Sequence, residues 1–240
     1  MVHRLDASIL QIAMSKRALP LLIIAALAAA GGLWAAQDLF GSLTGGRSAS
    51  SLPAVSSITL MPTPRVLPAF SLQQSDGTAL TGEELHGQWT LVFIGFTHCP
   101  DVCPTTLAQL ASAQKQWAAL PEASRPRVLF VSADPDRDTP KITGDYAHAF
   151  NNDSLAATAP VPELEAFARS MSLVFMKVPN ESRPDESRPG HNGRADDYSI
   201  DHSASMVVLD PHARMAGVIV PPFDPKAIAE DLIALTKASP

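Results

Sequence analysis

The sequence predicts an α/β domain behind one apolar segment near the N-terminus. Three observations support this fold class. Residues 18–36 carry no charged side chain. Beyond residue 66, short runs of apolar and β-branched residues alternate with segments in which apolar residues recur every three or four positions. The only two cysteines of the 240-residue chain, Cys99 and Cys103, follow the first of these apolar runs.

The apolar segment has the length of a transmembrane helix. As a helix, residues 18–36 would span about 28 Å, close to the thickness of the hydrocarbon core of a bilayer. Lys16 and Arg17 precede the segment and Asp38 follows it. The positive-inside rule then keeps residues 1–17 in the cytoplasm. We therefore expect a single-pass anchor in the inner (cytoplasmic) membrane, with the globular domain in the periplasm.

A cleaved signal peptide is the alternative interpretation of this segment. The apolar stretch is longer than the usual signal-peptide core of about 7–15 residues, and Trp34 would stand where a cleavage site needs a small residue. We therefore favour an uncleaved anchor. Met14, followed by Lys16 and Arg17, is an alternative translation start.

The composition of the remaining residues separates a linker from a globular part and argues against nucleic acid as a partner. Residues 37–65 are rich in Gly, Ser, Thr and Pro without a sustained period, which is typical of a flexible linker. Residues 66–240 are enough for one globular core. The formal net charge of −6 argues against a nucleic-acid surface. Small molecules, metal ions and other proteins remain as partners.

The first half of the globular part predicts two buried strands and two helices. The run 89–96 is apolar and β-branched, and behind it Leu107, Leu110, Trp117 and Leu120 recur at helical spacing. A second buried strand is expected over 127–132. Thr139 and Pro140 can cap and start a helix that carries Ile142, Tyr146 and Phe150 on one face.

The second half continues the alternation. Pro162 opens a helix, residues 173–178 form a short strand, and strands 205–209 and 215–220 flank a turn as a hairpin. Asp224 and Pro225 start a last helix. Strand–helix–strand units followed by a hairpin and a terminal helix are the order of a thioredoxin-like fold. Between Val178 and His202 hydrophobic residues are sparse and a short Glu-Ser-Arg-Pro repeat appears, so we expect a mobile loop there.

Cys99 and Cys103 lie at the first strand-to-helix junction. Unpaired N–H groups and the helix dipole at such a junction lower the pKa of a thiol, and the thiolate is both nucleophile and metal ligand. Their spacing leaves three interpretations: a reversible disulfide, a soft-metal site, or buried structural thiols. Two thiolates suit Cu(I), whereas zinc normally takes four ligands and the chain has no second cysteine pair.

A third ligand could come from Asp201-His202-Ser203, which precedes the hairpin strand expected to run beside the cysteines. An isolated histidine is more often structural, so the residues alone leave this role of His202 open. His98 is adjacent to Cys99 but would point to the other side of a continuing strand, where it would pack or support the ligands.

Three motifs resemble the Sco/SenC family of thioredoxin-like copper proteins, which are tied to cytochrome c oxidase assembly. They are Gly95-Phe96-Thr97-His98-Cys99-Pro100-Asp101-Val102-Cys103-Pro104-Thr105, Val131-Ser132-Ala133-Asp134-Pro135-Asp136-Arg137-Asp138-Thr139-Pro140 and Asp201-His202-Ser203. The resemblance implies a copper site made of Cys99, Cys103 and His202 that holds Cu(I) and Cu(II). It leaves the role of Asp134 and Asp138 open, and Asp138 or Thr139 could simply cap a helix.

The resemblance implies a membrane-anchored metallochaperone. Its expected partner is cytochrome c oxidase subunit II, or another copper-accepting protein, to which it delivers copper, whose cysteines it reduces, or both. Thiol reductants or other copper chaperones would act upstream. A thiol–disulfide oxidoreductase or peroxidase using the redox pair Cys99 and Cys103 is the second hypothesis. A copper-responsive sensor whose 178–202 loop becomes ordered on binding is the third.

Overall fold

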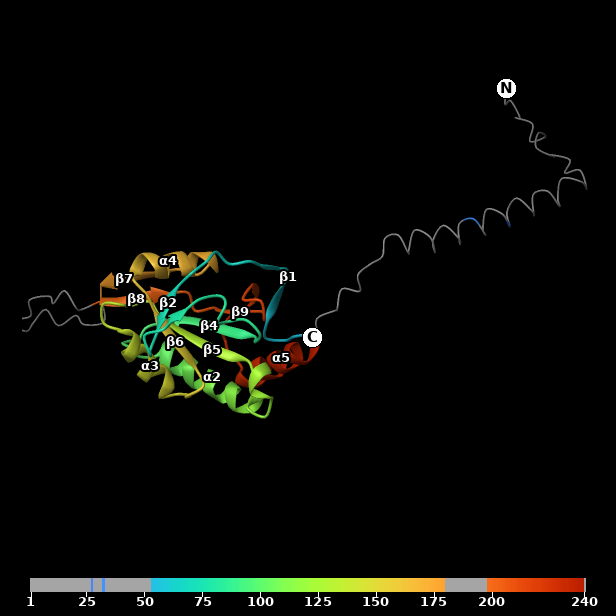
Figure 1. Cartoon of the computed structure of the whole chain (residues 1–240). Coiled ribbons are helices and arrows are strands. Elements are labelled where there is room, and N and C mark those ends of the chain that lie inside the picture. Colours follow the sequence, from blue (N-terminus) through green and yellow to red (C-terminus); the bar gives the residue numbers. More distant parts are fainter. Residues whose placement is uncertain (1–26, 28–31, 33–52, 180–197, 240) are drawn as a thin grey trace, which may run out of the picture. The chain divides into compact units, whose positions relative to one another are not determined.

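The computed structural model describes residues 27, 32, 53–179 and 198–239 (Figure 1). The predicted anchor at 18–36 lies almost entirely outside these residues, as does the part of the predicted linker before residue 53. Among the described residues, no helix is both long enough and apolar enough to cross a membrane.

An eight-stranded sheet forms the centre of the domain, in the order β1-β10-β9-β4-β5-β6-β2-β3. Strands β4, β5 and β6 are parallel neighbours, and every other pairing in this sheet is antiparallel. All six residues of β4 are buried, which explains its continuous apolar run. The strands are β1 (Thr59–Arg65), β2 (Leu72–Gln74), β3 (Ala79–Leu80), β4 (Thr90–Gly95), β5 (Arg127–Ser132), β6 (Leu155–Thr158), β9 (Met206–Leu209) and β10 (Met215–Ile219).

Helices cover both faces of this sheet. Figure 1 shows α2 and α5 together on one side and α4 on the other. Each buries an apolar stripe, as Leu107 and Leu110 of α2 illustrate. The helices are α2 (Val102–Trp117), α3 (Pro140–His148), α4 (Val161–Ser170) and α5 (Pro225–Ala238), with a short 3-10 turn at Glu122–Ser124. The predicted α/β class and the four predicted helices are confirmed.

A second, two-stranded sheet consists of β7 (Phe175–Pro179) and β8 (Tyr198–His202), paired antiparallel. Residues 198–202 were assigned to a mobile loop, but the structure places them in this strand. The rest of that predicted loop, residues 180–197, lies outside the described residues. The alternation of Tyr198, Ile200 and His202 on one strand face is the signal that distinguishes β8 from a loop.

The globular domain begins earlier than residue 66. Thr59–Arg65, which we assigned to the linker, forms β1 and pairs with β10. The segment before β1 is fastened to α5, because the buried carboxylate of Asp231 accepts hydrogen bonds from the backbone N–H groups of Ser56 and Ser57 at 2.9 and 2.6 Å. Two prolines in β1 hide its strand character in the sequence, and such residues are tolerated at a sheet edge.

One predicted helix face is also corrected. In α3 the buried residues are Thr143, Gly144 and Ala147, whereas Ile142 is exposed. Tyr146 and Phe150 are half-buried and their rings lie 5.4 Å apart, centroid to centroid. Small residues bring α3 close to the sheet, and Tyr146 packs on the ring of Phe130 in β5 at 5.6 Å, centroid to centroid. Of the predicted stripe, only Ile142 was assigned wrongly.

Candidate metal centre

The two cysteines occupy the turn between β4 and α2. Cys99 lies in the loop after β4, and Cys103 is the second residue of α2. The backbone N–H of Cys103 donates to the sulfur of Cys99 across 3.4 Å. Cys103 is fully buried and Cys99 is half-buried, and both are free thiols. The helix start therefore directs both sulfurs toward one place.

His202 comes to the same place from β8. Its Nε2 lies 3.4 Å from the sulfur of Cys103, and its Nδ1 lies 3.1 Å from the carbonyl oxygen of Ser203. A proton on Nδ1 that is donated to this carbonyl leaves the Nε2 lone pair facing the sulfur. The structure thus brings together Cys99, Cys103 and His202. Their role as metal ligands stays a prediction.

The electrostatics of Cys103 differ from the lowered pKa expected for a thiol at a helix start. Burial raises the pKa of Cys103 above its ordinary value, although a backbone N–H of Phe96 opposes the shift. Burial likewise lowers the pKa of His202. At neutral pH the site therefore presents a protonated Cys103 and a neutral imidazole, and a bound cation would supply the charge that stabilises the Cys103 thiolate.

Aromatic rings and one glycine shape the floor of the site. The rings of Phe93 and Phe96 meet the His202 ring edge to face, at centroid distances of 6.0 and 6.2 Å. A Cβ on Gly95 would lie 2.8 Å from the sulfur of Cys103 and 3.0 Å from Cε2 of Phe130. Only glycine at the end of β4 lets the Cys103 sulfur pack this close to the sheet.

Gly95→Ala is therefore expected to move the Cys103 sulfur and to lower the free energy of unfolding by about 1–3 kcal/mol, the usual cost of overpacking a core. Urea denaturation measures this loss. Gly82→Ala is the matched control, since its Cβ would meet only ordinary contacts at 3.8 Å. If the two variants had equal free energies of unfolding, the close packing of the Cys103 sulfur against Gly95 would be contradicted.

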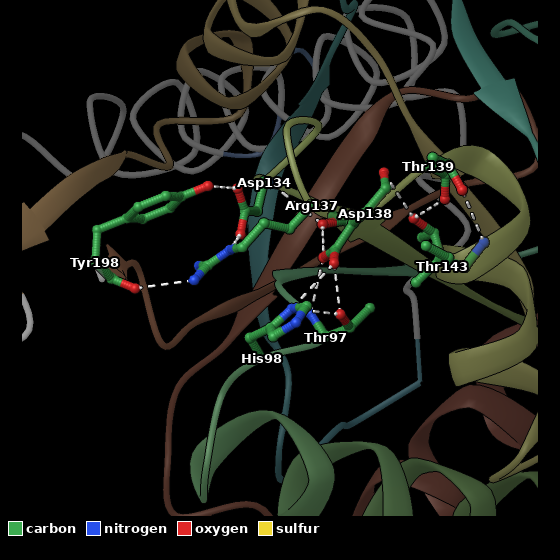
Figure 2. A network of polar contacts seen from close by, with 10 residues as sticks. Thr97, His98, Asp134, Arg137, Asp138, Thr139, Thr143 and Tyr198 are labelled. Atoms are coloured by element: carbon green, nitrogen blue, oxygen red, sulfur yellow. Dashed lines mark hydrogen bonds and ion pairs between the residues drawn. The ribbon is translucent and has the colours of Figure 1, made fainter. Parts of the chain in front are cut away.

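Asp138 contacts Thr97 and His98, the two residues that precede Cys99 (Figure 2). Its fully buried carboxylate accepts hydrogen bonds from the backbone N–H of Thr97 at 2.8 Å and from the hydroxyls of Thr97 and Ser132. The Nδ1 of His98 lies 3.5 Å from the same carboxylate. His98 therefore belongs to the support of the cysteine loop. Thr139, not Asp138, caps α3 by accepting from the N–H of Ile142 at 3.3 Å.

Asp134 joins a second part of this network, also drawn in Figure 2. It accepts hydrogen bonds from Nε of Arg137 and from the hydroxyl of Tyr198. Sequence reasoning missed both Arg137 and Tyr198. In the sequence, Arg137 stands out only as a cation between two acidic residues, Asp136 and Asp138. Tyr198 is marked only by the alternation of apolar residues along β8.

One atom each of His98, Asp134 and Asp138 can be chosen within 4.8 Å of one another, a grouping that could hold a cation. Both carboxylates, however, already accept hydrogen bonds from protein donors. We therefore assign this cluster to hydrogen bonding and not to a metal.

Comparison with known proteins matches this architecture to one family. The SCO1/SenC family model covers residues 59–237. The Arabidopsis thaliana mitochondrial protein SCO1 homolog 1 is 35% identical over 144 residues, which cover 59% of this chain and 38% of that protein. The chain thus matches well under half the length of this relative.

Two solved structures share the fold. The crystal structure of Arabidopsis thaliana ScoI with copper bound is 28% identical, with a TM-score of 0.60, and the match covers 72% of this chain and 97% of that one. The structure of Bradyrhizobium japonicum ScoI with copper bound is 29% identical, with a TM-score of 0.58 and coverage of 70% and 98%. The predicted thioredoxin-like domain corresponds to the fold of these proteins.

Proposed function

Because this chain belongs to the SCO1/SenC family, we propose that it binds copper through Cys99, Cys103 and His202 and transfers it to another protein. The observation that carries the proposal is the approach of His202 Nε2 to within 3.4 Å of the Cys103 sulfur, with its lone pair toward the thiols. Two related structures of 28% and 29% identity hold copper, which supports the same ion here.

The donor set suits copper better than zinc. Two sulfurs and one imidazole nitrogen make a soft, three-coordinate site that accepts Cu(I), and the imidazole also suits Cu(II). A structural zinc site would use a fourth protein ligand. A site of this kind can release its ion by ligand exchange with a similar donor set, as a delivery protein must do.

The proposed acceptor is the binuclear copper site of cytochrome c oxidase subunit II. Residues 18–36 would anchor the protein in the inner membrane, and the domain would face the periplasm, where the acceptor site is exposed. Reduction of the acceptor's cysteines is a second activity of the same pair. The half-buried Cys99 would attack the acceptor disulfide, form a mixed disulfide and release one acceptor thiol. Cys103 would then attack the Cys99 sulfur, release the second acceptor thiol and leave a Cys99–Cys103 disulfide.

A dedicated thiol–disulfide oxidoreductase or peroxidase remains the second candidate function. One observation favours it: the Cys99 side chain is partly accessible, and its sulfur accepts the backbone N–H of the buried Cys103. The buried Cys103 would serve as the resolving thiol.

Copper loading followed by transfer tests the proposal. Reduced protein is loaded anaerobically with Cu(I), desalted, and mixed with the metal-free soluble domain of an oxidase subunit II. We expect the loaded protein to hold about one copper ion per chain. After mixing, this copper should be found bound to the acceptor domain. Failure of the wild-type protein to retain copper against a modest competitor, together with rapid cycling of its cysteines with a dithiol, would favour the oxidoreductase instead.

A further inference from the structure

We propose that Asp134, Arg137 and Tyr198 form a clamp that positions His202 against the cysteines. This inference rests on the proposed copper site. The clamp residues do not touch the site sulfurs in the structure; they act on His202 through the strand that carries it.

The strand that carries His202 is not part of the main sheet. Among the strands that the structure describes, β8 pairs only with β7, in a separate two-stranded sheet. Ile200 packs into the core from this hairpin. Among residues 53–179 and 198–239, the polar side-chain contacts from the hairpin to the rest of the domain are Tyr198 with Asp134 and Arg137, Lys177 with Asp136, and His202 with Cys103. The Phe93 and Phe96 rings pack on the imidazole itself, but the polar contacts that hold the hairpin to the domain are few, and two of them are made by Tyr198.

Asp134 and Arg137 contact Tyr198 in three ways. Nη1 of Arg137 donates to the Tyr198 carbonyl oxygen at 3.1 Å, and the guanidinium lies over the tyrosine ring at 3.8 Å from its centroid. Asp134 accepts from both the tyrosine hydroxyl and Arg137 Nε, which closes the ring of contacts. Figure 2 shows the guanidinium reaching from Asp134 to the Tyr198 carbonyl. The main chain, the ring face and the hydroxyl of Tyr198 are therefore all held by Arg137 and Asp134.

Tyr198 transmits this position to His202 along the strand. The two residues are four apart in β8, so their side chains point to the same face. A shift or rotation of the strand at Tyr198 would therefore move the imidazole relative to Cys103.

The clamp and the cysteine loop share one support. The backbone N–H of Asp138 donates to the Asp134 carbonyl at 2.8 Å, while the Asp138 carboxylate receives the N–H of Thr97 from the cysteine loop. The turn after β5 thus holds the histidine strand with one aspartate and the cysteine loop with the other. This arrangement fixes the imidazole relative to the sulfurs before any ion is bound.

A mutant cycle tests the clamp in the full chain. Arg137→Gln and His202→Ala are made singly and together, with Arg169→Gln as the matched control. Arg169 also pairs with a carboxylate, at 3.1 Å from Glu165, but on the exposed face of α4. Copper affinity is measured by competition with a chelator of known affinity, and the nitrogen coupling to Cu(II) is measured by electron paramagnetic resonance.

We expect Arg137→Gln to weaken copper binding by about 10-fold and to reduce the nitrogen coupling. This is the lower end of the range for groups that directly support a metal-bound histidine, because Arg137 acts on His202 through the strand. Arg169→Gln should leave both unchanged. In the His202→Ala background, Arg137→Gln should change the affinity by less than about threefold, because the two substitutions remove the same interaction. Equal losses in both backgrounds, or no loss in either, would overturn the clamp.

A metal-free measurement separates this inference from the copper proposal. In the apo protein, Arg137→Gln and Tyr198→Phe should accelerate amide hydrogen exchange in β8, with the larger effect in Arg137→Gln. Tyr198→Phe keeps the ring and removes only the hydroxyl, so it serves if Arg137→Gln does not fold. If the wild-type protein binds no copper but the two variants exchange faster in β8 than wild type does, the proposed function is refuted and the clamp is retained. Unchanged exchange in both variants would refute the clamp.

Discussion

Replacing His202 with alanine is expected to weaken copper binding by at least about 100-fold, which corresponds to about 2.7 kcal/mol. The imidazole is neutral and its Nε2 faces the Cys103 sulfur, so the variant loses a preorganised donor and leaves two sulfurs alone. Simple dithiol exchange should stay within about twofold of wild type, because neither sulfur is removed. This split separates a copper carrier from a thiol oxidoreductase.

The measurement pairs a chelator competition for Cu(I) and Cu(II) with the rate of oxidation by a small disulfide. His86→Ala is the control, since His86 is exposed and has no part in the site. If His202→Ala retained copper like the control but exchanged thiols slowly, His202 would serve thiol chemistry and not the metal.

Replacing Asp138 with alanine is expected to cost on the order of 3 kcal/mol of unfolding free energy. The substitution leaves the N–H of Thr97 and the hydroxyl of Ser132 without their buried acceptor, and hydrogen bonds to charged groups are among the strongest in proteins. Because Thr97 is two residues before Cys99, the cysteine loop should also loosen. Asp138→Asn should be intermediate, since its amide N–H₂ faces donors on one side.

Urea denaturation of the metal-free protein measures this cost. Asp145→Ala is the matched control, because Asp145 forms an exposed ion pair with Lys141 on α3. Such surface pairs contribute at most about 1 kcal/mol. A loss for Asp138→Ala no larger than that for Asp145→Ala would show that the Asp138 hydrogen bonds do not stabilise the cysteine loop.

The fold was largely predictable because its strongest local signals agree with its tertiary contacts. β4 is buried along its whole length and was evident as an apolar run. The Pro residues that start α3 and α5 mark helix N-termini reliably. By contrast, β6 consists of Leu155 and small residues, and β1 contains prolines. Neither pattern differs from a loop until the neighbouring strand is known.

The candidate site shows the same limit. Cys99 and Cys103 are conspicuous because the chain has no other cysteine. His202 was linked to them through a family resemblance, since nothing local distinguishes it. Arg137 and Tyr198 meet 61 residues apart in sequence, and only the folded chain reveals their contact. The direction of the Cys103 pKa shift depends on burial, which the helix-dipole argument could not weigh.

X-ray absorption spectroscopy at the copper edge tests the central claim most directly. The protein is loaded with one equivalent of Cu(I), and its spectrum is compared with those of Cys99→Ser, Cys103→Ser and His202→Ala. We predict two sulfur neighbours and one imidazole nitrogen in wild type, one sulfur fewer in each serine variant, and both sulfurs without the imidazole in His202→Ala. A wild-type spectrum that lacks sulfur neighbours, or an imidazole signal that persists in His202→Ala, would contradict a site built from Cys99, Cys103 and His202.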